Sequence, residues 1–327
     1  MDTRYPCRIV CLTEEPTEVL YALGLSDLIV GISGFTVRPA RARREKPRVS
    51  AFTSAKIDRI LALRPDFVVG FSDIQADIAQ ALIKSGIEVW ISNHRSVAGI
   101  LGYVRRLGAL VGAAEQAERY ALKLEAHVEE VRTAATQLRR RPRVYFEEWD
   151  EPLITGIRWV SELIGIAGGD DVFPERALCA LAKDRILADA GEVVRRAPDV
   201  VLGSWCGKRF RPERVAARLG WEAVPAVRDG ELHEIKSPLI LQPGPAALTD
   251  GLDAIHRVLR QWSERPAAET DAVPSPCVDI CRLDARGLCI GCRRTIEEIM
   301  EWPRASAARR RQILGDLPLR NAPDHSR

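Results

Sequence analysis

The sequence predicts an α/β protein of two Rossmann-like lobes with parallel sheets, joined by one long helix and followed by a small cysteine-rich, metal-binding tail. Three observations predict this architecture. A short strand-like stretch, "PDFVVGF" at residues 65–71, recurs as "PDVVLGS" at residues 198–204. Strand-like and helix-like segments alternate around both copies. Four cysteines gather near the carboxyl end of a chain of 327 residues.

The repeat extends over three successive strands. Residues 8–12 correspond to 143–147, 65–71 to 198–204 and 85–92 to 219–226, at offsets of 135, 133 and 134 residues. The segments between them are amphipathic and end at Gly or Pro, as helices do. We therefore expect an N-terminal lobe at residues 1–93 and a C-terminal lobe at residues 142–263.

Residues 94–141 are expected to connect the lobes as a helical spine. Tyr120, Leu124, Val128 and Val131 form one apolar stripe at helical spacing. A helix of roughly 27 residues would span about 40 Å. Ligands of parallel α/β sheets collect at the carboxyl ends of the strands, so two such edges facing each other would make a cleft.

Composition and motifs exclude several function classes. A net charge of +3 is too small to indicate nucleic-acid binding, and no apolar run approaches the length of a membrane span. The glycine cluster at residues 165–171 follows a helix rather than a first strand, so it is not a dinucleotide fingerprint. An enzyme that uses Cys206 as nucleophile, with Lys208 lowering its pKa, stays an alternative, but no general base is identifiable.

The amino end, "MDTRYPCRIVCLTEEPTEVL", shows no basic region followed by an apolar export segment. Four of the eight cysteines are scattered and four are clustered near the carboxyl end, a distribution that does not indicate a disulfide framework. We therefore expect a cytoplasmic protein, or a periplasmic one if the true start lies upstream.

Residues 8–262 resemble the substrate-binding proteins of ABC importers for cobalamin, haem and ferric siderophores, most closely the cobalamin-binding members. The likeness rests on the two-lobe repeat, on "RPARARREKPRVSAF" followed by "KIDRILALRPDFVVGF", and on "FEEWDEPLITGIRWVSELIGIAGGDDVF" at residues 146–173. The resemblance implies a non-enzymatic clamp that holds one large ligand between the lobes with little hinge motion.

Aromatic side chains at strand ends and in cleft loops are the candidate ligand contacts. They are Phe35, Phe52, Phe71, Trp149, Trp159 and Trp205. Flat side chains suit the broad apolar face of a corrin ring. None of the six is Tyr or His, which disfavours haem, and only Arg38 and Arg158 could meet an anionic siderophore. We therefore expect cobalamin, and we expect His233 to be structural rather than a cobalt ligand.

Family members that feed an importer dock on an ABC transporter permease through one exposed carboxylate per lobe. Asp77 and Glu213 match those positions approximately, although two solvated surface charges are the simpler interpretation. The alternative function is therefore a periplasmic component of an ABC importer for ferric siderophore or haem.

The carboxyl end is expected to be a separate module. Residues 264–275 have linker composition, residues 276–318 would form a four-cysteine domain and residues 319–327 a tail. Its candidate metal ligands are Cys277, Cys281, Cys289 and Cys292. Four thiolates at this spacing can hold zinc or an iron–sulfur cluster, and the spacing does not choose between them. The segment resembles a short bacterial domain family of unknown function that is often predicted to bind iron–sulfur.

Overall fold

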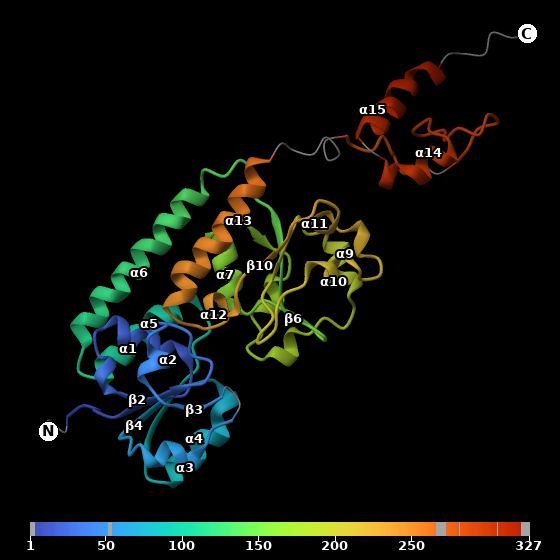
Figure 1. Cartoon of the computed structure of the whole chain (residues 1–327). Coiled ribbons are helices and arrows are strands. Elements are labelled where there is room, and N and C mark those ends of the chain that lie inside the picture. Colours follow the sequence, from blue (N-terminus) through green and yellow to red (C-terminus); the bar gives the residue numbers. More distant parts are fainter. Residues whose placement is uncertain (1–3, 52–53, 266–272, 281, 306, 322–327) are drawn as a thin grey trace, which may run out of the picture. The chain divides into compact units, whose positions relative to one another are not determined.

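The computed structural model describes residues 4–51, 54–265, 273–280, 282–305 and 307–321. The chain divides into two compact units, Met1–Glu264 and Arg265–Arg327. The first unit holds two α/β lobes and their helical connection, and the second holds the short helices α14 (Ile296–Glu301) and α15 (Ala307–Asp316) (Figure 1). None of the described helices combines the length and apolarity that a bilayer span requires.

The first lobe is built on a five-stranded parallel sheet in the order β3-β2-β1-β4-β5. Its strands are β1 (Ile9–Cys11), β2 (Ile29–Ser33), β3 (Arg48–Ser50), β4 (Phe67–Phe71) and β5 (Glu88–Ser92). Helices α1 (Glu14–Ala22), α2 (Ala42–Glu45), α3 (Ile57–Ala62) and α4 (Ala76–Lys84) connect them. The order in which the strands are added reverses between β1 and β4, which is where doubly wound sheets open a crevice for ligands.

The second lobe has a mixed sheet in the order β10-β9-β6-β7, with β8 paired to β6. Its strands are β6 (Arg143–Asp150), β7 (Leu153–Thr155), β8 (Asp170–Asp171), β9 (Val200–Gly203) and β10 (Leu232–Glu234). Its helices are α7 (Arg158–Ile166), α8 (Pro174–Ala177), α9 (Gly191–Arg196), α10 (Pro212–Ala216), α11 (Pro225–Arg228), α12 (Ser237–Ile240) and α13 (Leu252–Glu264). The pairing of β7 with β6 is antiparallel, so the expectation of two purely parallel sheets is wrong for this lobe.

The prediction that residues 219–226 form the third strand of the repeat in the second lobe is also wrong. Residues 219–226 form a single helical turn at Trp221–Ala223 and the start of α11. Pro225 begins α11, and Trp221 is fully buried in a hydrophobic cluster of the second lobe that includes Tyr145 and Trp205. The strand that pairs with β9 comes later, at β10. Apolar spacing alone could not distinguish this buried turn from a strand.

The lobes are joined by two helices rather than one. Helix α5 (Val97–Leu110) ends before Gly112, and α6 (Ala114–Ala135) follows with 22 residues, or about 33 Å. Gly112 has a φ of +76°, a left-handed conformation that glycine adopts at low cost. A Cβ on Gly108 would lie 2.1 Å from the Cβ of Ala117, so this glycine lets α5 approach α6 closely.

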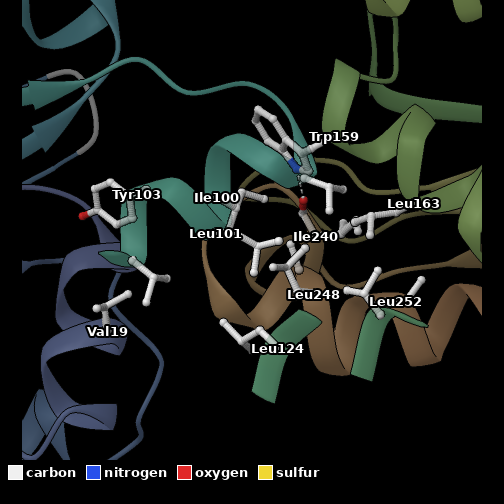
Figure 2. Close-up of a cluster of buried hydrophobic side chains, with 14 of the residues drawn as sticks. Val19, Ile100, Leu101, Tyr103, Leu124, Trp159, Leu163, Ile240, Leu248 and Leu252 are labelled. Carbon is white, nitrogen blue, oxygen red and sulfur yellow. Dashed lines mark hydrogen bonds between the residues drawn. The ribbon is translucent and has the colours of Figure 1, made fainter. Parts of the chain in front are cut away.

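One hydrophobic core runs through both lobes and the connecting helices. Figure 2 shows Ile100 and Leu101 of α5, Leu124 of α6 and Trp159 of α7 gathered around Ile240 of α12. The indole Nε1–H of Trp159 donates a 2.8 Å hydrogen bond to the carbonyl oxygen of Ile240. In Figure 1, α13 lies along α6, and the two helices are in contact. A shared core of this kind limits how far the lobes can move apart.

The second unit has a short helical core. Thr295 and Glu298 form a capping box at the start of α14. Trp302, Ile313 and Val273 are buried together, and the guanidinium of Arg294 lies 4.7 Å from the centre of the Trp302 ring. Few large apolar side chains contribute to this core, which is small for an independently stable domain.

Candidate functional site

Two cavities lie where the strands of both sheets end. Cavity A has a volume of about 480 Å³ and is bordered by segments of both lobes. From the first lobe it takes Thr13 and Glu14 after β1 and Ser33 and Phe35 at the end of β2; from the second it takes Glu148 of β6, Cys206 after β9 and Ser237 after β10. The carboxyl ends of the two sheets therefore face a common space.

Cavity B has a volume of about 390 Å³ and is also bordered by both lobes. The first lobe contributes Phe71 and Ser72 at the end of β4, and the second contributes Trp159 of α7 and Arg185. Glu148 and Leu241 border cavity A and cavity B alike. The two cavities thus adjoin, and together they form the cleft that the strand order predicts.

Glu14, which lines cavity A, and its neighbour Glu15 are unusual for their burial. Glu14 is 8% exposed, and burial raises its pKa to about 8, with Glu15 and Glu18 raising it further. Burial likewise raises the pKa of Glu15 to about 7, against the effect of a 2.6 Å hydrogen bond from the Thr13 hydroxyl. At neutral pH the Glu14 carboxyl is therefore mostly protonated.

The charges of cavity B are mostly paired. Arg185 is 1% exposed and binds both carboxylate oxygens of Glu148, at 2.6 and 3.1 Å. Arg95 donates hydrogen bonds to Ser72 and, at 3.2 Å, to Asp73, and its guanidinium lies 5.4 Å from the Phe71 ring centre. Cavity B is therefore richer in charge than the aromatic sequence pattern suggests, although most of that charge is internally balanced.

Three of the predicted aromatic contacts border the cleft. Phe35 lines cavity A and is 49% exposed, so its ring is available to a ligand. Phe71 and Trp159 line cavity B, are almost buried, and meet edge to face with ring centres 6.5 Å apart. Phe52 lies outside the described residues.

Trp149 and Trp205 border neither cavity. Trp205 is 2% exposed and packs in the second lobe's core, where its Nε1–H donates to Glu147 at 3.0 Å. Trp149 is half-buried against the same core, and its Nε1–H donates to the carbonyl oxygen of Glu151. A direct ligand contact by either side chain stays a prediction.

The cations and histidines considered from the sequence are engaged elsewhere. Arg38 bridges Glu18 and Asp250, and Arg158 pairs with Glu162. His233 lies 2.7 Å from a carboxylate oxygen of Glu231 and borders neither cavity.

Sequence reasoning overlooked His94, which follows β5 by two residues. Its ring nitrogens contact the Ser92 hydroxyl at 2.7 Å and the Pro243 carbonyl oxygen at 2.6 Å. Burial lowers the pKa of His94 to about 4, so the ring is neutral. Both nitrogens are occupied, so His94 holds the 243 loop against the first lobe rather than serving as a metal ligand.

Cys206 is at the cleft but lacks the environment of an activated nucleophile. Its pKa is raised by burial and by the nearby carboxyl groups of Glu148 and Glu14. Lys208, expected to lower that pKa, instead pairs with Asp150 and lies 4.0 Å from the Trp149 ring centre. The premise of the nucleophile alternative is therefore wrong, because a thiol with a raised pKa is less reactive.

Asp77 lies on α4 and Glu213 on α10, and both are exposed. Docking through these two carboxylates stays a prediction.

The described thiols of the second unit share one cavity. Cys277, Cys289 and Cys292 border an apolar space of about 310 Å³, and Cys281 lies outside the described residues. Backbone N–H groups of Cys292 and Gly291 lower the pKa of Cys289. Within the described ranges, no three His, Cys, Asp or Glu side chains are arranged to hold a metal ion.

The family model for periplasmic binding proteins matches residues 9–239 of this sequence. The chain belongs to the periplasmic binding protein family. Residues 275–321 match a second family model, described as a protein of unknown function, DUF1289. Both family resemblances inferred from the sequence are confirmed, as is the prediction that this is a binding protein and not an enzyme.

Curated relatives and solved structures agree with this assignment. A "Vitamin B12-binding protein" of Vibrio parahaemolyticus is 24% identical over 245 residues, which are 74% of this chain and 85% of the relative. One of Yersinia pestis is 26% identical over 214 residues, covering 64% and 73%.

Among solved structures, the periplasmic vitamin B12-binding protein BtuF of Vibrio cholerae has a TM-score of 0.63 at 22% identity, covering 80% of this chain and 99% of the other. The periplasmic heme-binding protein RhuT of Roseiflexus has a TM-score of 0.66 at 22% identity, covering 77% and 98%. These structural similarities establish the fold of residues in the first unit.

Glu14 and Glu148 are the cleft residues that sequence reasoning missed. Glu14 begins the helix that follows the first strand of a doubly wound lobe, which is a position that could have singled it out. Glu148 lies within a strand whose alternation gave no sign of which side chains reach the cleft.

Proposed function

We propose that this protein binds a cobalamin-type corrinoid in the cleft formed by cavities A and B. The observation that carries the proposal is that two adjoining cavities open between the carboxyl ends of both sheets. A large flat ligand needs an elongated site with walls on both sides, and the cleft supplies it. The curated B12-binding relatives cover most of the first unit and support the same ligand class.

The chemistry of the cleft favours a corrinoid over haem. Among the described residues that line cavities A and B there is no His or Tyr to serve as an axial iron ligand. Cavity A carries two carboxyl groups, Glu14 and Glu148, against one exposed cation, Arg43. A ligand rimmed with carboxylates or catecholates would find Arg43 as the one cation in the described lining of cavity A, whereas the neutral amides of a corrinoid need no countercharge.

Phe35, Phe71 and Trp159 would supply the apolar contacts. Phe35 is exposed in the free protein and would lose water on ligand binding. Phe71 and Trp159 are already held by their edge-to-face contact and by the bond from Trp159 to Ile240, so their ordering adds little entropic cost.

Equilibrium dialysis against cyanocobalamin, hemin and a ferric catecholate siderophore tests the proposal. We expect saturable binding of cyanocobalamin and much weaker binding of the other two. Phe35→Ala should raise the Kd for cyanocobalamin about tenfold, the equivalent of about 1.4 kcal/mol. Leu122→Ala is the matched control, because Leu122 is a 52% exposed apolar side chain on α6 that borders neither cavity.

Absence of cyanocobalamin binding at micromolar concentrations would overturn the corrinoid proposal. Preferential binding of hemin or the siderophore complex would favour the importer alternative. Equal effects of Phe35→Ala and Leu122→Ala would show that the ligand does not occupy cavity A.

We further propose a cytoplasmic location. The seven described cysteines are all free, which suits a reducing compartment. Fractionation of cells that produce the full chain should recover it with cytoplasmic markers. Recovery from the periplasm would favour the alternative, in which the exposed Asp77 and Glu213 dock on a permease. In that case Asp77→Lys and Glu213→Lys should reduce ligand-dependent transport without changing ligand affinity.

For the second unit we propose that Cys277, Cys281, Cys289 and Cys292 bind zinc or an iron–sulfur cluster. The donor type fits, because three of these thiols border one cavity and four thiolates are the ligands that zinc and iron–sulfur clusters take. The bound metal would stabilise a domain with a small core. Elemental analysis of anaerobically purified protein should find metal or iron plus sulfide, and Cys289→Ser with Cys292→Ser should abolish it. Metal-free, fully folded protein would contradict the proposal.

A further inference from the structure

Glu14 occupies a special place in the cleft. It is the first residue of α1, three positions after the end of β1, where the strand order of the first lobe reverses, and it lines cavity A with only 8% of its surface exposed. In the described part of the chain it forms no ion pair, and the backbone N–H of Val37 is its hydrogen-bond donor. The carboxyl group therefore keeps most of its hydrogen-bonding capacity for a ligand.

The charged groups around Glu14 favour its neutral form. Glu15 and Glu18 lie on the same helix, Glu148 faces it from β6, and the Cys206 thiol lies in the loop after β9. The one nearby cation that lines cavity A is Arg43 of α2, and it is exposed. Neutralisation of Glu18 by Arg38 and of Glu148 by Arg185 lessens the repulsion. Burial is the dominant cause that raises the pKa of Glu14 to about 8.

We propose that Glu14 acts as a neutral carboxylic acid that recognises a primary carboxamide on the rim of the ligand. A protonated carboxyl group has one O–H donor and one C=O acceptor, and a primary amide presents the complementary pair. The two groups can therefore form a reciprocal, doubly hydrogen-bonded contact. This inference rests on the proposed corrinoid function and adds a specificity-determining residue to it.

A direct consequence is that ligand affinity depends on pH although a neutral amide does not titrate. Above its pKa the Glu14 carboxylate loses the donor and becomes a buried charge that must be desolvated by the bound ligand. If the complex requires the protonated form, linkage predicts that Kd rises about 30-fold between about pH 6.5 and about pH 9.5.

The test is the Kd of cyanocobalamin across this pH range for the full chain and three variants. Glu14→Gln keeps a donor and an acceptor at every pH, so its Kd should be independent of pH. Glu14→Ala should bind more weakly at neutral pH, by about tenfold, and also without pH dependence. Glu115→Gln is the matched control, because the Glu115 side chain is 90% exposed on α6; it should keep the wild-type pH profile.

The outcomes separate the two proposals. If no variant binds cyanocobalamin at any pH, the corrinoid function and this inference both fail. If the wild type binds and its Kd is flat across the range, or if the Kd rises with pH as strongly in Glu14→Gln as in the wild type, the corrinoid function stands and the role of Glu14 is overturned. Circular dichroism at each pH confirms that the compared proteins are folded.

Discussion

The ion pair between Glu147 and Arg218 should be one of the most sensitive points of the second lobe. Glu147 is fully buried in β6, and Arg218 binds both of its carboxylate oxygens, at 2.6 and 2.8 Å. The Trp205 indole donates to the same carboxylate. This cluster fixes the end of β6 and the start of the loop that carries Cys206 into cavity A.

Arg218→Met would remove the charge while keeping a long apolar side chain. Glu147 would then be a buried carboxylate without its cation, although it would still accept a hydrogen bond from the Trp205 N–H. Removing one partner of a buried ion pair typically costs about 3–5 kcal/mol of unfolding free energy. The double variant Glu147→Gln with Arg218→Met removes both charges, so it should recover at least about 1.5 kcal/mol of that loss.

Urea denaturation followed by tryptophan fluorescence measures these differences. Arg214→Met is the matched control: Arg214 has a 54% exposed side chain, 3.6 Å from Asp150, and its loss should cost about 1 kcal/mol or less. A cost below about 1 kcal/mol for Arg218→Met, or a double variant less stable than the single one, would refute the reasoning.

Three further predictions concern other parts of the first unit. A Cβ on Gly203 would meet ring carbons of Phe210 at 1.9 and 2.0 Å, so Gly203→Ala should lower the unfolding free energy by about 2 kcal/mol or more. Gly165 lies on an exposed face of α7, and a Cβ there would have no atom within 4 Å, so Gly165→Ala should raise the unfolding free energy by up to about 1 kcal/mol. Urea titrations of the two variants measure both changes. The pKa of Glu14 is about 8 in the folded protein against the ordinary value of 4.5, so the folded state retains a proton that the unfolded state loses, and the unfolding free energy should fall as pH rises from about 4.5 to about 8. Glu14→Gln should reduce that fall by about 2–4 kcal/mol in denaturation curves recorded at several pH values. An unchanged dependence of stability on pH would contradict the assignment. Trp159→Phe, which loses the hydrogen bond to Ile240, should cost about 1–2 kcal/mol, and Trp159→Ala about 3–5 kcal/mol; equal costs would show that packing at this position is unimportant.

The internal repeat predicted much of the fold correctly. The runs at residues 8–12, 65–71 and 85–92 are β1, β4 and β5, and those at 143–147 and 198–204 fall in β6 and β9. Strands β1, β4 and β9 are buried at every position and are continuous apolar runs, which are recognisable in a sequence.

Where the prediction failed, the local pattern was ambiguous. The stretch at residues 219–226 is apolar like a strand, but Pro225 starts a helix and Trp221 fills the core from a helical turn. The break at Gly112 was missed because helix-forming residues flank it on both sides. Both cases are decided by tertiary packing, which propensity does not report.

The candidate site was predictable as a place but not as a set of side chains. Strand ends identified Phe35 and Phe71, which line the cleft, yet the same reasoning selected Trp205, whose ring turns into the core toward Glu147. The direction of a side chain after a strand depends on the turn that follows. The buried acid Glu14 was passed over because charged residues are ordinarily solvated.

The most direct test of a ligand in the cleft is protection of Cys206 from alkylation. Cys206 lines cavity A, whereas Cys7 is an exposed thiol just before the amino end of β1, and the cavity lies at the carboxyl ends of the strands. Mass spectrometry after a short iodoacetamide pulse should show Cys206 labelling that falls with cyanocobalamin occupancy while Cys7 labelling stays constant. Unchanged labelling of Cys206 at saturating cyanocobalamin would contradict the placement of a corrinoid between the lobes.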